Sequence, residues 1–276
     1  MTNTISDTAF YCCGVRMEDA ERKNSICNDH YARLFMDERA VKIYEPFKSE
    51  TRPNISNITR CRIIDDIVSG ELAKNKNTLI VTIGCGFDTR PYRLSGGDWI
   101  EIDEPQIINY KNEKLPVADC KNRLQRIIID FSRESLRSKL ENIGTGQTVI
   151  IVIEGVFMYL EPEAINATLK EIRDLFPGHM LLCDLMTKAF FEKYAQSIHS
   201  KLVVTGGTFT ARPDKPEKIF IENKYIEIDS TPMMKRAMEL GLYWSELKTP
   251  SFIIRLMLAA FMKDLNGYAV YRFRHG

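Results

Sequence analysis

Beyond residue 77, short apolar runs rich in β-branched residues recur along the chain, and each is closed by glycine, proline or charged residues. The runs are TLIVTIG (78–84), DWIEID (98–103), QRIIID (125–130), TVIIVIE (148–154) and HMLLCDL (179–185). Runs of this length and composition are typical of buried strands. Helical spacing of apolar residues fills the intervals at 104–115, 133–143 and 161–176. This alternation predicts an α/β fold with a mainly parallel sheet and helices on both faces.

The N-terminal region has a different pattern. Residues 1–76 show mostly helical spacing, which is clearest at 28–35 and 59–75. Because this region precedes the first predicted strand, we expect an N-terminal helical cap that folds over the carboxyl edge of the sheet. The core of the protein would then comprise residues 77–276.

Residues 186–225 interrupt the alternation of strands and helices. A helix-like stretch is followed there by a polar connector, TARPDKPEK, which predicts a helical, lid-like insertion or an elaborated crossover. After it, the patterns at 224–230, 233–243 and 267–275 are typical of a strand, a helix and a strand. We expect these last elements to close the sheet with an antiparallel pair.

Charge and cysteine content exclude several kinds of binding partner and site. The 276 residues include 38 basic and 37 acidic side chains, so no net field favours nucleic acid or an anionic membrane, and we expect a small partner. Seven cysteines without a CxxC pair argue against a disulfide framework and a zinc site, and fit a cytoplasmic protein. The longest apolar stretch, 251–262, is too short to span a bilayer and contains Arg255. We expect neither a metal nor a membrane contact, and the oligomeric state stays open.

A glycine-containing turn follows the first predicted strand. Gly84 and Gly86 let the backbone approach a ligand closely, at the strand ends where open α/β sheets bind ligands. A dinucleotide fingerprint requires a third glycine where the chain has Thr89, so a pyrophosphate site is disfavoured. Asp103, at the end of the second strand, either accepts ribose hydroxyls or caps the helix that begins near Pro105. The turn and the aspartate together favour a nucleoside ligand.

Four segments add a more specific pattern. They are IGCGFDTRPYRL (83–94), EIDEP (101–105), IIIDF (127–131) and EGVFMYLEPE (154–163). With these segments in this order, the chain resembles the leucine carboxyl methyltransferase family of S-adenosylmethionine-dependent enzymes. The resemblance implies a Rossmann-like class I methyltransferase fold, in which a seven-stranded sheet has an antiparallel last strand. It also accounts for Asp88 in the glycine turn, since an aspartate is usual there in the family.

The resemblance further implies that S-adenosylmethionine is the cofactor. Asp103 would accept its ribose hydroxyls, and Asp130 with Phe131 would hold its adenine. Glu154 would bind its ammonium group, and Arg60 its carboxylate. The full set of implied cofactor-binding residues is Arg60, Gly84, Cys85, Gly86, Asp88, Asp103, Asp130, Phe131 and Glu154.

Structural roles remain open for several of these residues. Asp130 could cap the helix that follows it, Glu154 could be a buried acid with a partner, and Arg60 could be a solvated surface charge. Arg16 aligns loosely with a second basic residue of the family's N-terminal segment and is an alternative partner for the cofactor's carboxylate.

The residues that contact the methyl acceptor are inferred from the chemistry of the reaction more than from a sequence motif. Methyl transfer from a sulfonium is an in-line displacement, for which the enzyme supplies mainly positioning and desolvation. A carboxylate is already ionised at neutral pH, so it needs no base. Tyr159, Arg90 or Arg93 would face such an acceptor, although Tyr159 could equally be a packed aromatic. Among the four histidines, His199 in the lid-like segment is the one we retain as a candidate base.

These observations predict an O-methyltransferase that esterifies a carboxylate of a small molecule or a peptide terminus. One alternative is a nicotinamide-dependent oxidoreductase, which Asp103 fits equally well but the glycine pattern does not. Another alternative is a catalytically silent relative that binds the cofactor without turning it over.

Overall fold

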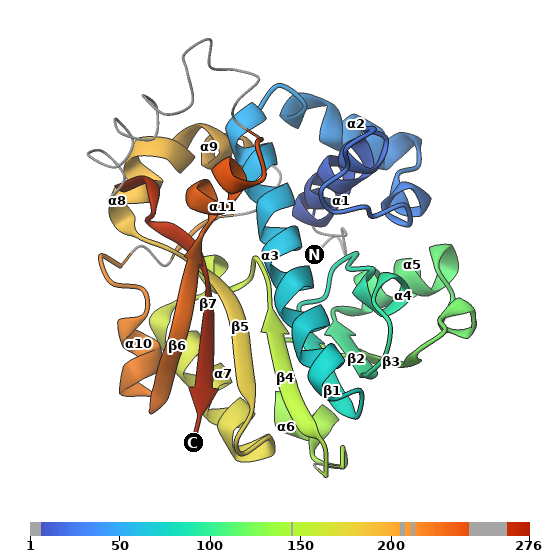
Figure 1. The fold of residues 1–276 in the computed structure, drawn as a ribbon, viewed down its shortest axis with the longest axis vertical. Coiled ribbons are helices and arrows are strands. Elements are labelled where there is room, and N and C mark those ends of the chain that lie inside the picture. Colours follow the sequence, from blue (N-terminus) through green and yellow to red (C-terminus); the bar gives the residue numbers. More distant parts are fainter. Residues whose placement is uncertain (1–6, 145, 205–207, 211–212, 243–263) are drawn as a thin grey trace.

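A seven-stranded sheet forms the centre of the protein (Figure 1). The computed structural model describes residues 7–144, 146–204, 208–210, 213–242 and 264–276. Its strands are β1 (Thr78–Ile83), β2 (Asp98–Asp103), β3 (Arg123–Ile128), β4 (Thr148–Ile153), β5 (Met180–Met186), β6 (Tyr225–Pro232) and β7 (Tyr268–His275). The ends of each strand lie within two residues of those that the apolar pattern predicts.

The order of the strands is β3-β2-β1-β4-β5-β7-β6. The first five strands along the chain pair in parallel, and β7 runs antiparallel to both of its neighbours, β5 and β6. The mainly parallel sheet and its antiparallel closing pair are therefore confirmed.

Helices surround this sheet (Figure 1). Over the described residues they are α1 (Asp7–Ala20), α2 (Glu38–Tyr44), α3 (Thr51–Lys74), α4 (Arg90–Arg93), α5 (Pro105–Lys114), α6 (Leu136–Leu140), α7 (Pro162–Leu175), α8 (Lys188–Phe190), α9 (Gln196–Val204), α10 (Lys218–Glu222) and α11 (Met233–Glu239). Short 3₁₀ turns occur at η1 (Ala32–Phe35), η2 (Glu45–Phe47), η3 (Val117–Asp119) and η4 (Phe157–Tyr159), and a π-helical turn, η5 (Phe191–Ala195), joins α8 to α9.

Both faces of the sheet are covered by helices, because neighbouring residues of a strand point to opposite sides. On one face Ile80 of β1 belongs to a buried cluster with Ile64 and Val68 of α3. On the other face Val81 belongs to a cluster with Leu169 of α7. Burial on both sides explains why the central strands are continuous apolar runs.

Three predicted helices are shorter than their patterns suggested. The segment 28–35 forms only the turn η1, since Asn28 adopts a left-handed backbone (φ 52°) that interrupts a helix. The helix predicted at 133–143 begins later, because the Ser135 hydroxyl caps α6 by accepting from the Ser138 amide (3.2 Å). The helix predicted at 233–243 ends at Glu239, before the left-handed Gly241 (φ 77°).

The N-terminal helices lie against the end of the sheet at which β1, β2 and β4 finish. Arg16 of α1 donates to the Phe87 carbonyl in the turn after β1 (2.8 Å), and α3 runs along the sheet (Figure 1). The arrangement agrees with a helical cap, while the boundary at residue 76 stays a prediction.

Two sequence predictions fall partly or wholly outside the described residues. The apolar stretch 251–262 lies outside them, as do parts of the lid-like segment 186–225, so its action as a lid stays a prediction. In the part that the structure describes, Lys201 of α9 pairs with Glu50 (2.6 Å), which ties this segment to the N-terminal region. No helix within the described residues is long and apolar enough to cross a membrane.

Candidate functional site

A cavity of about 800 Å³ opens at the carboxyl ends of β1, β2 and β4. It is bounded by the turns after these strands and by residues of α1, α3, η5, α9 and α11. Its volume falls in the range of roughly 300–1,000 Å³ that is common for small-molecule sites. The order of the strands reverses between β1 and β4, which is where open α/β sheets bind their ligands.

The turn after β1 needs its glycines. Gly84 has a left-handed backbone (φ 67°), and a Cβ there would come within 2.7 Å of Val156 Cγ2. Gly86 is also left-handed (φ 47°), but its nearest neighbour for a Cβ is Ala9 at 4.0 Å. A side chain at 86 would therefore have space within the protein, and its position lines the cavity that a ligand would fill. Cys85, between them, also lines the cavity, while its Sγ lies 3.7 Å from the buried Lys111 ammonium.

Asp103 holds this turn in place. Its Oδ2 accepts from the Gly86 amide (2.6 Å) and its Oδ1 accepts from the Glu104 amide (2.7 Å). The residue is only 8% exposed, and burial raises the pKa of Asp103 despite these two hydrogen bonds. A carboxylate has about four lone-pair sites, so each oxygen can still accept one further hydrogen bond, as a ribose diol would require.

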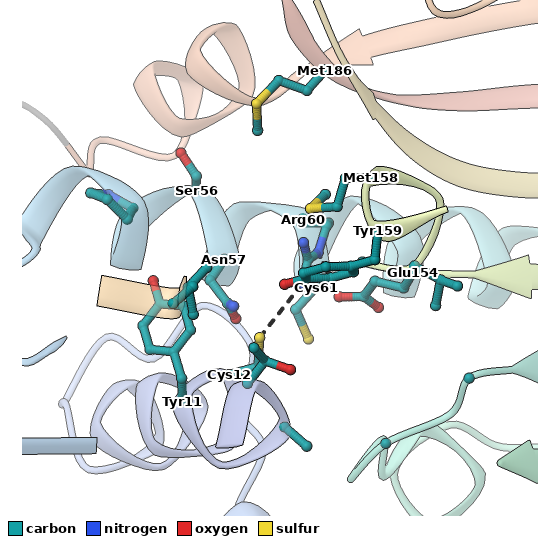
Figure 2. A pocket seen from close by; sticks show the side chains of 18 of the residues that line it. Tyr11, Cys12, Ser56, Asn57, Arg60, Cys61, Glu154, Met158, Tyr159 and Met186 are labelled. Atoms are coloured by element: carbon teal, nitrogen blue, oxygen red, sulfur yellow. Dashed lines mark hydrogen bonds and ion pairs between the residues drawn. The ribbon is translucent and has the colours of Figure 1, made fainter. Parts of the chain in front are cut away.

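Arg60 and Glu154 form an ion pair at the wall of the cavity (Figure 2). Arg60 Nε lies 2.8 Å from Glu154 Oε1, and its Nη1 donates to Asp184 Oδ2 (3.1 Å) and the Tyr268 hydroxyl (2.7 Å). The other oxygen of Glu154 lies 2.8 Å from Arg90 Nη1. Burial would raise the pKa of Glu154, but the charges of Arg90 and Arg60 outweigh burial and lower it. The sequence assigned Arg60 to the carboxylate of the cofactor and Glu154 to its ammonium group. In the structure these two residues also pair with each other.

The other arginines near the turn are held by carboxylates. Arg16 pairs with the buried Asp29 (2.8 Å). Arg90 pairs with Asp88 (2.8 Å), and although burial opposes ionisation of Asp88, the Arg90 charge holds its pKa at about 2. Arg93 pairs with Asp65 and lies outside the cavity lining. Of the two arginines that the sequence offered to an acceptor, the cavity therefore includes Arg90, which is engaged by carboxylates.

The predicted adenine residues separate in the structure. Phe131 lines the cavity and is 43% exposed. Asp130 lies outside the lining, and its Oδ1 accepts from the amide and hydroxyl of Ser132 (3.0 and 2.5 Å). Asp130 thus holds a local turn, whereas the helix that follows, α6, is capped by Ser135 and not by Asp130 as the sequence allowed. Nearby, Gln106 lines the cavity, and its Oε1 is buried without a hydrogen-bond partner among the described residues.

Tyr159 lies in the cavity wall beside Arg60 (Figure 2). It is partly buried, and burial raises the pKa of its hydroxyl. Its ring also packs edge-on against Phe209 (5.1 Å between centroids), so packing and a ligand-facing position are compatible. His199 lies outside the lining, where its Nε2 accepts from the Phe209 amide (3.2 Å) and its ring packs on Phe191 (5.1 Å).

Sequence analysis missed several residues of this site. Asp184 is fully buried near the end of β5 and also accepts from the Gly155 amide (2.6 Å). Tyr268 begins β7, and because this strand is antiparallel its first residue lies at the carboxyl edge of the others. An acid near the end of a predicted strand was a usable signal for Asp184. Nothing local marks Tyr268.

A family comparison identifies the type of protein. The model of the leucine carboxyl methyltransferase family matches residues 11–173. The chain belongs to this family. The match spans the N-terminal helices, the glycine turn, Asp103 and Glu154, so the resemblance seen in the sequence is confirmed.

Individual relatives of this leucine carboxyl methyltransferase family member are distant. An S-adenosyl-L-methionine-dependent methyltransferase of Gibberella zeae, dpfgK, is 23% identical over 62% of this chain and 61% of its own length. The tetracenomycin polyketide synthesis O-methyltransferase TcmP of Streptomyces glaucescens is 24% identical over 54% of each protein. The chain thus spans roughly half of the length of these curated relatives.

Solved structures show the fold of this family member. The magnesium protoporphyrin IX methyltransferase of Synechocystis, a structure with bound S-adenosylhomocysteine, superposes with a TM-score of 0.51. The match covers 96% of this chain and all of that chain at 12% sequence identity. The protein therefore has the Rossmann-like class I methyltransferase fold, as the sequence predicted.

Proposed function

We propose that this protein is an S-adenosylmethionine-dependent O-methyltransferase that esterifies a carboxylate of a small molecule or a peptide terminus. Membership of the leucine carboxyl methyltransferase family supports it, as do relatives whose names include S-adenosylmethionine dependence and O-methyl transfer. The observation that carries the proposal is the cavity at the strand ends, where the glycine turn, Asp103 and the Arg60–Glu154 pair face one ligand-sized space.

The residues present fit this cofactor. The free lone pairs of Asp103 suit the two ribose hydroxyls, and the exposed ring of Phe131 offers an apolar surface to adenine. Arg60 and Glu154 present opposite charges side by side, as the zwitterionic amino-acid end requires. When bound, S-adenosylmethionine supplies an electrophilic methyl group on its sulfonium. The protein's own residues bind this molecule, orient it and exclude water.

A carboxylate acceptor suits the surrounding residues. A phenol or alcohol needs a positioned group to take its proton, whereas a carboxylate of pKa about 4 is ionised at neutral pH. Among the described residues that line the cavity, none is histidine or lysine. The raised pKa of Tyr159 makes its phenolate a poor candidate for a base. An acceptor that is already ionised therefore suits this site best, because it needs no residue to take its proton.

The test is transfer of a labelled methyl group to a panel of carboxylic acids, alcohols and amines, followed by mild alkali. We expect a product that releases volatile labelled methanol, as methyl esters do. An alkali-stable product would contradict the carboxylate assignment while leaving methyl transfer intact.

Titration calorimetry with S-adenosylhomocysteine and NADH separates the alternatives. Binding of S-adenosylhomocysteine without transfer to any acceptor would favour a silent relative, and binding of NADH alone would favour an oxidoreductase.

A further inference from the structure

One face of helix α3 forms a continuous wall of the cavity. Arg52, Ser56 and Arg60 recur at intervals of four residues along it. Asn57 lies between the last two, and Figure 2 shows Ser56, Asn57 and Arg60 on this helix. Residues four apart share one face of a helix. With a rise of 1.5 Å per residue, the backbone of Arg52 lies about 12 Å along the helix from that of Arg60. The wall thus extends from the cofactor-binding residues to a distant part of the same cavity.

The carboxylates that line the cavity lie near the strand ends, whereas Arg52 lies in the distant part. Of the four arginines that line the cavity within the described part of the chain, Arg16, Arg60 and Arg90 each pair with a carboxylate. Arg52 is exposed, and the structure gives it no ion pair or hydrogen bond with any described residue. Its neighbour Glu50 pairs instead with Lys201 (2.6 Å). Within the described residues, the lining carboxylates are Asp88, Asp103, Glu104 and Glu154, which lie at the end of β2 or after β1, β2 or β4.

Asn57 provides a second, independent observation. It lines the cavity, is 7% exposed, and its Oδ1 is buried with no hydrogen-bond partner among the described residues. Leaving such an atom unpaired costs about 1–3 kcal/mol, and a carboxylate, which only accepts hydrogen bonds, recovers part of this cost when the amide turns so that its Nδ2 takes the place of Oδ1. The amide has a donor and an acceptor end, and half a turn about its last bond lets it donate to a carboxylate oxygen.

Much of the remaining lining of the cavity is apolar. It includes Met158, Met186, Phe190, Ile198 and Met234. Thioether side chains adapt to the shape of a ligand and contact aromatic rings favourably. The body of a molecule that contacts these residues should therefore be apolar or aromatic.

We propose that the methyl acceptor is an apolar or aromatic molecule that carries a second anionic group, remote from the carboxylate that reacts. Arg52 pairs with the remote anion, and Asn57 bonds to the reacting carboxylate one helical turn before Arg60. This inference rests on the proposed function, because it concerns the acceptor of the same site.

The test uses two matched probes, naphthalene-2,6-dicarboxylate and 2-naphthoate, titrated into protein saturated with S-adenosylhomocysteine. We expect the diacid to bind more tightly than the monoacid, and Arg52→Gln to weaken the diacid by about threefold to fivefold while leaving the monoacid unchanged. Asn57→Ala should weaken both probes to a similar degree. Arg62→Gln, on the same helix but outside the cavity lining, is the matched control and should change neither.

Failure of S-adenosylhomocysteine to bind the wild-type protein would count against the proposed function itself. If S-adenosylhomocysteine binds, the inference about Arg52 is overturned by either of two results. One is that neither probe binds, and the other is that Arg52→Gln leaves the ratio of the two affinities unchanged.

Discussion

Replacing Asp103 by alanine removes a carboxylate that joins the glycine turn to the end of β2. In the structure its oxygens accept from the Gly86 and Glu104 amides at 2.6 and 2.7 Å. As an anion it would also accept two ribose hydroxyls, and a hydrogen bond to a charged group contributes about 1.5–3 kcal/mol. The two ribose hydroxyls and the two backbone amides bond to the same carboxylate. We therefore reduce the summed contribution of the two ribose hydrogen bonds to about 2–4 kcal/mol. This corresponds to a loss of affinity of roughly 30- to 1,000-fold.

The assay for Asp103→Ala is calorimetric titration with S-adenosylhomocysteine, together with urea unfolding of the same variant. Asp98→Ala is the matched control, since Asp98 lies at the opposite end of the same strand and outside the cavity lining. It should bind with wild-type affinity. A folded Asp103→Ala protein with unchanged affinity would refute the assignment of Asp103 to the ribose.

The same residue predicts a pH dependence of binding. Because burial raises the pKa of Asp103, its carboxylate takes up a proton at a higher pH than an exposed aspartate does when the solution is acidified. The affinity for S-adenosylhomocysteine should be complete above this pKa and fall as the pH drops through it. Asp103→Asn should bind weakly and lack this fall.

Three further predictions concern the turn, the buried network and the far end of the sheet. Gly86→Val should cost about 1–2 kcal/mol of stability from its left-handed backbone and block cofactor binding, whereas the control Gly178→Val, also left-handed and with no atom within 4 Å, should lose stability alone. Asp184→Asn should lower the free energy of unfolding in urea by about 3 kcal/mol, because it weakens the buried pair of Asp184 with Arg60 while Arg60 still pairs with Glu154. An effect as small as that of the surface control Asp229→Asn would contradict this prediction. Burial lowers the pKa of His179 to about 4, so stability should be complete above about pH 6.5 and fall by up to about 3 kcal/mol as the pH drops towards 4, a fall that His179→Gln should lack.

The strands were predictable because their signal is local. A run such as 148–154 is apolar and β-branched at every central position, and β4 is buried on both faces as that composition requires. The segment 28–35 shows the limit of the method. Its apolar spacing suggested a helix, but a single left-handed residue, Asn28, and the Asp29 side chain that accepts from the Ala32 amide (3.2 Å) reduce it to one turn.

The positions of the site residues were predictable, but their partners were not. Gly84, Gly86, Asp103 and Glu154 follow strands whose carboxyl ends meet by topology, so their proximity could be inferred from the sequence. Arg60 is different, because its partners are 124 and 208 residues away along the chain. No local pattern records contacts of that range, so the sequence could not show that Arg60 lies inside a buried network.

The buried network around Arg60 and Glu154 affects how strongly the site would bind a zwitterion. Arg60 is held by Asp184 and Tyr268, and Glu154 by Arg90, so both charges are fixed and largely desolvated by the protein itself. A ligand that meets fixed charges does not have to order them, which favours its binding. Each new ion pair nevertheless shares a charge that already has a partner, so its net contribution is smaller than that of a free charge. The same sharing means that loss of Arg60 would free one oxygen of Glu154 for an ammonium group. Affinity for the cofactor is therefore a property of the network as a whole, and it cannot be divided into one charge for each end of the ligand.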